Sequence, residues 1–262
     1  MRVKIAGADI HYDAQGEGPA LLLLHGFPLD RRMWDPQVAA FPGFTVVRVD
    51  LRGFGASPAG DALLTMERIA DDAAGLLDHL GLSRAIVCGL SMGGYAAFAF
   101  ARRHAERLRG LVLTNTRAVP DDDESRRRRA ELAEEVRRRG VAAAADAFLP
   151  KLLGETTRRA RPELVEQVRA LALSQSQQGV IDALGGLAAR SDSRPTLREI
   201  VAPTLVISGA EDVISPPDEA REMHAAIAGS RLAIVPDAGH LSNLENPDAW
   251  NAAVLAFLRD LR

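Results

Sequence analysis

The sequence lacks a second cysteine and any long hydrophobic run. Its single cysteine, Cys88, cannot form an internal disulfide, and the apolar stretch 85–88 around it is typical of a buried strand, which permits a reducing compartment. The most evident apolar run, 20–24, is far shorter than the roughly 20 residues of a membrane-spanning helix. The first residues show no apolar segment followed by a small-residue cleavage site. We therefore predict a soluble, cytoplasmic protein without a membrane partner.

The sequence also lacks an excess of charge of either sign. Lys and Arg number 32 against 35 Asp and Glu, so the net charge of −3 creates no general attraction for nucleic acid. Arginine clusters at 126–129 and 137–139 suggest a nucleic-acid interface, but the segment 117–193 holds 14 Arg or Lys against 13 Asp or Glu. A mixed face of this kind is typical of a solvated surface, and we predict no nucleic-acid partner. Apolar residues make up 47% of the chain, which excludes disordered and fibrous classes.

Short apolar runs without polar alternation recur along the chain. Such runs are typical of parallel strands that are covered by helices on both faces. The segments 66–80 and 94–108 between them have helical spacing, and strand–helix alternation indicates an α/β fold with a mostly parallel central sheet flanked by helices. Near the N-terminus, 3–5 and 10–12 predict an edge hairpin. The predicted strands are 20–24, 45–49, 85–88, 110–113, 203–207 and 232–235.

The alternation stops between residues 117 and 193. This segment has no convincing strand, and its first helix begins with acidic residues at 121–124, ends with arginines at 137–139 and is followed by Gly140. Such an order matches the helix dipole and a glycine C-cap. We predict a helical cap at 117–193 inserted into an α/β core domain formed by 1–116 and 194–262.

The strongest local motif is Gly89-Leu-Ser91-Met-Gly93, between the strand 85–88 and a predicted helix. On a sharp strand-to-helix turn, flanking glycines let the helix and strand approach closely and leave the serine hydroxyl exposed above the sheet. This setting predicts that Ser91 is a nucleophile. The competing interpretation is that Ser91 only caps the helix.

A serine nucleophile needs a base, usually histidine, and an acid that orients it. His240 follows the strand 232–235, at the sheet edge where ligands of α/β proteins bind. Asp212 follows the strand 203–207 in the same way, although Glu211 next to it could compete for the role of the acid. His25 reads as a structural turn residue. The four other histidines fit packing or surface roles: His11, His79, His104 and His224.

Backbone N–H groups are needed to stabilise the oxyanion that forms on the substrate. The residue after the nucleophile supplies one of them, so we predict the Met92 N–H. The second is expected from the loop after the strand 20–24, in His25-Gly-Phe27-Pro, where Gly26 permits a close approach. We predict the Phe27 N–H as this donor.

These motifs, in this order, resemble those of the α/β-hydrolase fold family. The resemblance implies the triad Ser91, Asp212 and His240, favours Asp212 over Glu211, and implies that Asp50 and Arg52 form a structural turn. Because position 115 is Asn, the acid location that some members use there is unavailable. The segments that carry the resemblance are His25-Gly-Phe-Pro28, Asp50-Leu-Arg-Gly-Phe-Gly-Ala-Ser57, Cys88-Gly-Leu-Ser-Met-Gly-Gly94, Gly209-Ala-Glu-Asp212 and Gly239-His-Leu-Ser-Asn-Leu-Glu-Asn-Pro247.

Two of these segments, 88–94 and 239–247, are similar to those of 3-oxoadipate enol-lactonases, small carboxylesterases and cofactor-free haloperoxidases. The serine at position 91 argues against haloalkane dehalogenases and epoxide hydrolases, which carry aspartate there. The resemblance implies a carboxylic ester hydrolase that cleaves small esters or lactones through an acyl-enzyme. Enol-lactonase or perhydrolase activity, C–C bond hydrolysis, a lyase and a ligand-binding receptor remain alternatives.

The substrate pocket is expected where the cap meets the core. Leu90, Phe148 and Leu152 are candidate apolar lining, although the two cap residues could equally pack in a core. The sequence places no basic residue in this pocket, so an anionic lactone stays possible but unsupported. No metal cluster or phosphate-binding loop is recognisable, and we predict no metal and no cofactor. A small molecule is the expected partner, and the chain is expected to be a monomer or homodimer.

Overall fold

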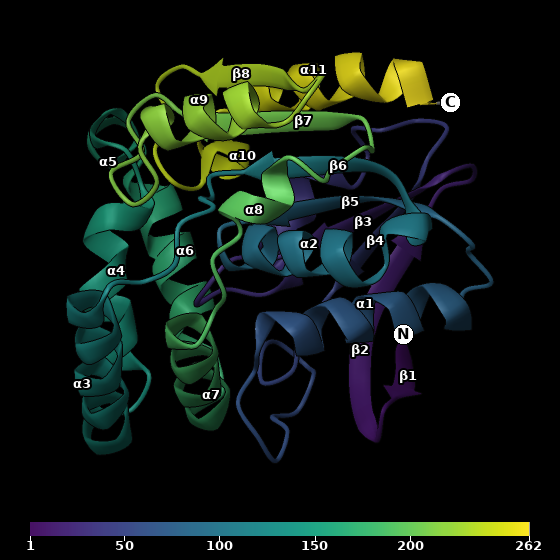
Figure 1. Ribbon diagram of the computed structural model, residues 1–262. Helices are drawn as coiled ribbons and strands as arrows, with labels where there is room; N and C mark the ends of the chain where they lie inside the picture. Colours follow the sequence, from purple (N-terminus) through teal and green to yellow (C-terminus); the bar gives the residue numbers. More distant parts are fainter. Residues whose placement is uncertain (262) are drawn as a thin grey trace.

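A sheet of eight strands forms the centre of the computed structural model, which describes residues 1–261 (Figure 1). The strand order is β1-β2-β4-β3-β5-β6-β7-β8; β1 and β2 form an antiparallel hairpin, β2 runs antiparallel to β4, and the remaining neighbours are parallel. The six predicted runs and the hairpin are confirmed. The strands are β1 (Arg2–Ile5), β2 (Ala8–Gln15), β3 (Ala20–Leu24), β4 (Thr45–Val49), β5 (Ala85–Leu90), β6 (Leu108–Thr114), β7 (Thr204–Gly209) and β8 (Arg231–Val235).

Helices cover both faces of the sheet, which explains why its central strands are continuously apolar. Successive strand residues point to opposite faces. In β3, Leu22 and Leu24 join the core under one helical layer, whereas Leu21 and Leu23 join the core on the other face. The first layer contains α1 (Met66–His79), α2 (Met92–Arg103) and α9 (Pro217–Ala226); the second contains η1 (Arg31–Gln37) and α11 (Pro247–Leu258).

Six further α-helices lie between β6 and β7. They are α3 (Asp123–Arg139), α4 (Ala142–Leu152), α5 (Glu155–Ala160), α6 (Pro162–Leu173), α7 (Gln177–Ala188) and α8 (Arg194–Leu197). The remaining short helices are η2 (Ala105–Arg107), α10 (Ser242–Glu245) and η3 (Arg259–Leu261). Within residues 1–261, no helix combines the length and the apolar character that crossing a bilayer requires.

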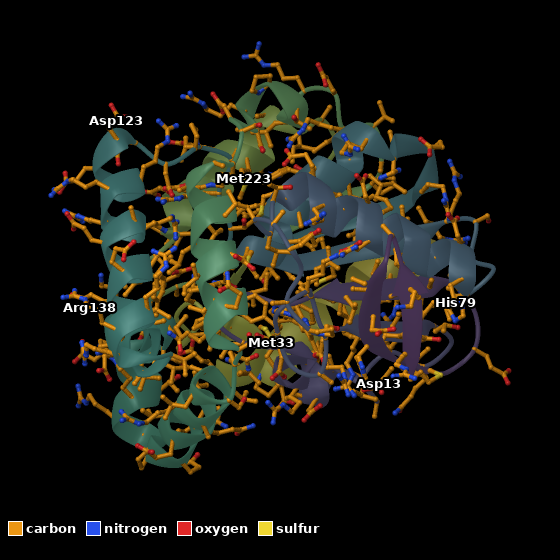
Figure 2. The ribbon with its side chains drawn as sticks, turned by 90° about the horizontal axis from the view of Figure 1, so that it is seen from below. Asp13, Met33, His79, Asp123, Arg138 and Met223 are labelled. Atoms are coloured by element: carbon orange, nitrogen blue, oxygen red, sulfur yellow. The ribbon has the colours of Figure 1, made fainter. Side chains whose placement is uncertain are left out.

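The ends of α3 follow the predicted dipole pattern. Asp122 is its N-cap and accepts a hydrogen bond from the Ser125 N–H at 2.8 Å, and the chain leaves the helix at Gly140, whose φ of 75° suits glycine. The outer face of α3 is charged, and Figure 2 shows Asp123 and Arg138 projecting from it away from the rest of the molecule. This helix therefore buries only one narrow stripe against its neighbours.

The helical insertion α3–α8 lies at the carboxyl ends of the parallel strands (Figure 1). The predicted fold class, an α/β-hydrolase fold with a helical insertion, is confirmed. The helix α8 contacts α2 and α9, which belong to the first helical layer on the sheet. We therefore propose that residues 117–193 form the cap. Residues 1–116 and 194–262, which include α8, form the core domain.

Candidate active site

Ser91 lies on the sharp turn between β5 and α2. Its φ of 54° and ψ of −110° are strained for a residue with a side chain, a conformation that costs on the order of 1–3 kcal/mol. The two flanking glycines are sterically required: an added Cβ on Gly89 would lie 2.1 Å from the Gly93 carbonyl oxygen, and one on Gly93 would lie 2.2 Å from the Leu24 carbonyl oxygen. The turn therefore presents a half-buried serine side chain at the start of α2.

His240 and Asp212 form a buried pair beside this turn. His240 Nδ1 lies 3.0 and 2.9 Å from the two carboxylate oxygens of Asp212, and both residues are almost fully buried. Burial alone raises the pKa of Asp212, but the positive field and hydrogen bond of His240 and the hydrogen bonds from Asn115 and Ser215 outweigh it, so the pKa is lowered. Asp212 is therefore ionised at neutral pH and orients the imidazole.

Glu211 points to a different partner, although it is adjacent to Asp212. It accepts hydrogen bonds from the Thr156 N–H at 2.9 Å and from the Thr156 hydroxyl, at the start of α5. These bonds lower the pKa of Glu211. Of these two carboxylates, the one that reaches His240 is Asp212, and Glu211 instead connects the insertion to the sheet.

Two polar residues that were not predicted, Asn115 and Ser215, contact Asp212, and Ser242 contacts Asn115. Asn115 Nδ2 donates to Asp212 Oδ2 at 2.9 Å and to the Gly239 carbonyl at 3.1 Å. The Ser215 N–H and hydroxyl donate to the Asp212 carboxylate at 3.0 and 3.2 Å, and Ser242 Oγ donates to Asn115 Oδ1. The sequence gives one indication of this contact: Asn115 directly follows β6, so it lies at the same edge of the sheet as Asp212.

The predicted oxyanion donors, Phe27 and Met92, belong to residues that line the same cavity as Ser91. Met92 is the first residue of α2, so its N–H has no acceptor within the helix. The Leu29 N–H donates to the Gly26 carbonyl at 3.0 Å, which closes a turn that has Phe27 in its middle. Phe27, Met92, Ser91 and His240 line the same cavity.

This cavity has a volume of about 40 Å³, room for one to three water molecules. Phe148 and Leu152 of α4 line it, as the sequence analysis expected. Leu90 does not, because it points to the opposite face of β5 and packs in the core with Ile86 and Cys88. Arg117 and Arg129 also line the cavity, where the sequence alone had placed no basic residue. The complete lining is Phe27, Ser91, Met92, Tyr95, Arg117, Arg129, Phe148, Leu152, Leu187, Ile214 and His240.

Comparison with known proteins identifies the family. A sequence model described as the alpha/beta hydrolase fold matches residues 19–247. The chain belongs to the α/β-hydrolase fold family. The resemblance found in the motifs is thus confirmed, and the protein is a hydrolase of this family.

Individual relatives of this α/β hydrolase include lactonases and esterases. It is 32% identical to 3-oxoadipate enol-lactonase 2 of Acinetobacter baylyi, over 94% of this chain and 90% of that protein. An esterase from Thermogutta terrifontis, solved with malate bound, superposes with a TM-score of 0.96 at 43% identity. The superposition covers 100% of this chain and 99% of the esterase chain. The enol-lactonase from Burkholderia xenovorans gives a TM-score of 0.92 at 36% identity, with 99% and 100% covered. Non-heme haloperoxidases are also among the similar proteins.

Four of the other histidines of this α/β hydrolase have side-chain partners: His25, His79, His104 and His224. The Leu51 N–H donates to His25 Nε2 at 3.0 Å, and His25 Nδ1 lies 3.1 Å from the Gly26 carbonyl, so both ring nitrogens are occupied. Burial also lowers the pKa of His25. His79, His104 and His224 hydrogen-bond to Tyr12, Asp71 and Ser230, respectively. Within residues 1–261, no three His, Cys, Asp or Glu side chains are grouped so that they could bind a metal ion.

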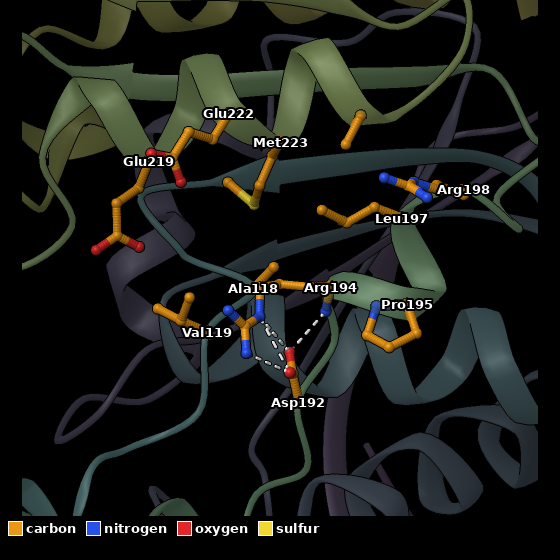
Figure 3. Close-up of a pocket in the computed structure, with 11 residues that line it drawn as sticks. Ala118, Val119, Asp192, Arg194, Pro195, Leu197, Arg198, Glu219, Glu222 and Met223 are labelled. Carbon is orange, nitrogen blue, oxygen red and sulfur yellow. Dashed lines mark hydrogen bonds and ion pairs between the residues drawn. The ribbon is translucent and has the colours of Figure 1, made fainter.

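The larger cleft of the hydrolase lies away from Ser91. It has a volume of about 540 Å³ and opens between α8 and α9, where Leu197 faces Met223 (Figure 3). Two of its charged residues are paired with each other, since Asp192 accepts hydrogen bonds from Arg194. None of the four residues Phe27, Ser91, Met92 and His240 lines it. Its size therefore does not make it the site of the chemistry, which needs a nucleophile and a base.

Proposed function

We propose that this protein is a carboxylic ester hydrolase that cleaves small esters or lactones through an acyl-enzyme on Ser91. The observation that carries the proposal is the buried Asp212–His240 pair, held at 2.9–3.0 Å beside the cavity that Ser91 lines. A hydroxyl is a weak nucleophile at neutral pH and needs an adjacent base. The pair supplies both the base and the carboxylate that orients it.

In the proposed reaction, Ser91 Oγ attacks the carbonyl carbon while His240 Nε2 takes the hydroxyl proton. The Asp212 carboxylate accepts the Nδ1–H, which leaves Nε2 unprotonated and able to accept. The N–H groups of Phe27 and Met92 stabilise the oxyanion of the tetrahedral intermediate. His240 then protonates the leaving alcohol, and a water activated by the same imidazole hydrolyses the acyl-enzyme.

The size of the cavity favours short acyl groups. It measures about 40 Å³ and is narrowed by Phe27, Phe148 and Leu152. The rings of Phe27 and Phe148 pack edge to face at 5.1 Å, which joins a core residue to a residue of α4 across the cavity. A longer acyl chain has to displace this contact, so we expect acetate and butyrate esters to be cleaved faster than octanoate esters.

Lactones are a second substrate class for the same residues. Relatives named as enol-lactonases are 32% and 36% identical to this chain over nearly its whole length. A lactone is a cyclic ester, so the same attack by Ser91 opens the ring and leaves the alcohol attached to the acyl group. The panel of substrates therefore includes unsubstituted lactones beside linear esters.

The test compares the wild type with Ser91→Ala on 4-nitrophenyl acetate, 4-nitrophenyl butyrate and lactones. We expect turnover to fall by about 10⁴-fold or more, because the nucleophile is removed. Ser83→Ala, an exposed serine that precedes β5, is the matched control and should retain wild-type rates. Equal turnover by the wild type and Ser91→Ala would contradict the proposal.

A further inference from the structure

A second hollow, which we call the insertion pocket, lies behind the Ser91 cavity. It has a volume of about 260 Å³, against about 40 Å³ for the cavity itself. Its walls come from α3, α4 and α7, and α3 packs against both of the other helices (Figure 1). All of its lining residues belong to the segment 117–193, so it lies within the insertion and not at the junction with the sheet. They include Arg128, Arg129, Leu132, Ala147, Phe148 and Leu184.

Two side chains separate the insertion pocket from the Ser91 cavity, since Arg129 and Phe148 line both spaces. Arg129 is fixed, because it donates to both carboxylate oxygens of Asp121, whose side chain is completely buried. Phe148 is held by apolar contacts, among them the edge-to-face contact with Phe27 at 5.1 Å. Rotation of the Phe148 side chain would therefore join the two spaces.

The backbone around Phe148 also permits movement. Pro150, in the last turn of α4, has no N–H, so the helical hydrogen bond to the Asp146 carbonyl cannot form. Phe148 lies between these two residues, and its side chain is only partly buried. The turn of α4 that carries Phe148 is therefore less constrained than a turn with a complete set of hydrogen bonds.

The inner surface of the insertion pocket is apolar. Each of the three helices contributes a large apolar side chain to it: Leu132 from α3, Phe148 from α4 and Leu184 from α7. Leu184 is fully buried, whereas Leu132 and Phe148 are only partly covered. An aliphatic chain bound here would remove the remaining apolar surface of these two residues from water, which favours binding.

The charges around the insertion pocket are compensated within the insertion. Arg128 pairs with Glu124 on the exposed face of α3, and Arg129 pairs with Asp121. Lys151 is exposed to solvent. Since both arginines already have a carboxylate partner, the pocket is better suited to an uncharged chain than to an anion.

We propose that the insertion pocket binds the distal part of an aliphatic acyl chain whose ester carbonyl lies at Ser91. Phe148 is then the specificity-determining residue that moves aside to admit the chain, which lies against Leu132 and Leu184. This inference rests on the proposed ester hydrolysis and adds medium-chain esters to its substrate class. Displacement of Phe148 opposes binding, so octanoate esters are cleaved more slowly than butyrate esters, although they are still substrates.

Removing the Phe148 ring is the first test. Phe148→Ala should raise the ratio of kcat/KM for 4-nitrophenyl octanoate to kcat/KM for 4-nitrophenyl acetate by about 10- to 100-fold. This is the effect of two or three further methylenes in apolar contact, each of which contributes about fourfold. Leu149→Ala is the matched control, because Leu149 is equally half-buried but lines neither space; it should keep the wild-type ratio. Circular dichroism establishes that both variants are folded.

Filling the insertion pocket is the complementary test. Ala147 is exposed and lines the pocket but not the Ser91 cavity, so Ala147→Phe should lower the octanoate-to-acetate ratio by about 10-fold, in the wild type and in Phe148→Ala. Ala130→Phe, at an exposed alanine of α3 that lines neither space, is the control. An equal loss on both esters in Ala147→Phe would mean that the pocket is only an entrance, which overturns the proposal.

A binding measurement separates this inference from the proposed chemistry. Octanamide carries the same chain without an ester, and calorimetry on Ser91→Ala combined with Phe148→Ala should detect its binding. Adding Ala147→Phe should abolish that binding. If no ester is hydrolysed through Ser91 but octanamide binds in this way, the proposed function fails and the chain site stands. If the acetate ester is hydrolysed through Ser91 while Phe148→Ala leaves the ratio unchanged and octanamide does not bind, the chain site is overturned and the proposed function stands.

Discussion

The Ser91 cavity is built from two regions with different physical character. Ser91, Asp212 and His240 come from turns at the carboxyl ends of β5, β7 and β8, and their surroundings are dense in hydrogen bonds. The opposite wall comes from the helical insertion, through Arg129 and side chains of α4. Parallel strands joined by backbone hydrogen bonds fix the first region, whereas packed helices, which can shift relative to one another, form the second.

The insertion is attached to the sheet region by a limited set of polar contacts. Gln175 donates to Asp30 at 2.8 Å, and the Gly154 N–H donates to Glu245 at 2.7 Å. Arg161 donates to the Leu244 carbonyl at 3.2 Å. The three residues of the proposed triad thus lie at the ends of sheet strands, whereas the insertion supplies the opposite wall of the cavity. The two regions should therefore respond differently to mutation.

Adjacent positions 211 and 212 give the largest expected contrast. Asp212→Asn removes the charge that orients His240 and favours the wrong tautomer, so kcat should fall by about 10⁴-fold. Glu211→Gln changes a residue that faces α5 and should leave kcat within about threefold of the wild type. Steady-state kinetics on 4-nitrophenyl acetate measure both. Similar losses of kcat in the two variants would contradict the different roles that we assign to Asp212 and Glu211.

Asn115→Gly tests how strongly the sheet region positions its acid. Glycine adopts the φ of 47° at this position without strain, so the variant isolates the loss of the side chain. Because the bond to Asp212 involves a charged group, we expect kcat to fall by about 10- to 100-fold while KM changes little. An equal rise in KM, or an unchanged kcat, would contradict a positioning role.

Asp30→Asn tests the attachment of the insertion. Burial raises the pKa of Asp30, but hydrogen bonds from Arg32 and Gln175 outweigh it and lower the pKa to about 2, well below the ordinary value of an aspartate. Because the pKa is lower in the folded state, the stabilisation is complete above pH 4 and is lost as the pH falls through about 2. At pH 7 the variant should lose up to about 2 kcal/mol of unfolding free energy.

Urea unfolding between pH 7 and pH 3 measures this effect. The difference between the wild type and Asp30→Asn should shrink as the pH falls, since the unfolded wild type binds a proton at this carboxylate at a higher pH than the folded protein does. Circular dichroism at each pH establishes that both proteins are folded before urea is added. A difference that is constant over this range would show that the charge of Asp30 does not stabilise the junction.

Arg127→Gln on α3 should have the smallest effect. Arg127 and Glu131 lie 3.1 Å apart on an exposed helix face, and such surface pairs contribute about 0.5 kcal/mol or less. We expect the melting temperature to change by no more than a few degrees. The difference between wild type and variant should become smaller as salt is added, because salt screens the surface ion pair. A large loss of stability would mean that the charged face of α3 is structural and not merely solvated.

Much of the fold could be predicted because it depends on local patterns. The strand positions follow from runs such as 20–24 and 203–207, and the end of α3 follows from Gly140. The turn at Ser91 was predictable for a similar reason, since only glycine fits at positions 89 and 93 around the strained serine. His240 was selected because it follows a strand at the functional edge of the sheet.

Other parts of the site could not be predicted, because they depend on contacts between distant segments. The expected role of Leu90 depended on which face of β5 points to the cavity. Both faces of β5 are buried and apolar, so the sequence does not indicate which of them that is. Arg117 and Arg129 were indistinguishable from the other arginines of a nearly neutral segment until Asp121 and Arg190 were located beside them. Asn115 became relevant only when β6 was found between β5 and β7.

The sequence by itself determined the order of strands and helices, the serine turn and the residues available as base and acid. These features depend on hydrophobic periodicity and on short motifs, both of which involve residues close together in the chain. Only the tertiary structure decided that Asp212 and not Glu211 reaches His240, and that Arg117 lines the cavity beside Ser91. Both depend on the direction of side chains packed against segments far away in the chain, and no local pattern encodes that direction.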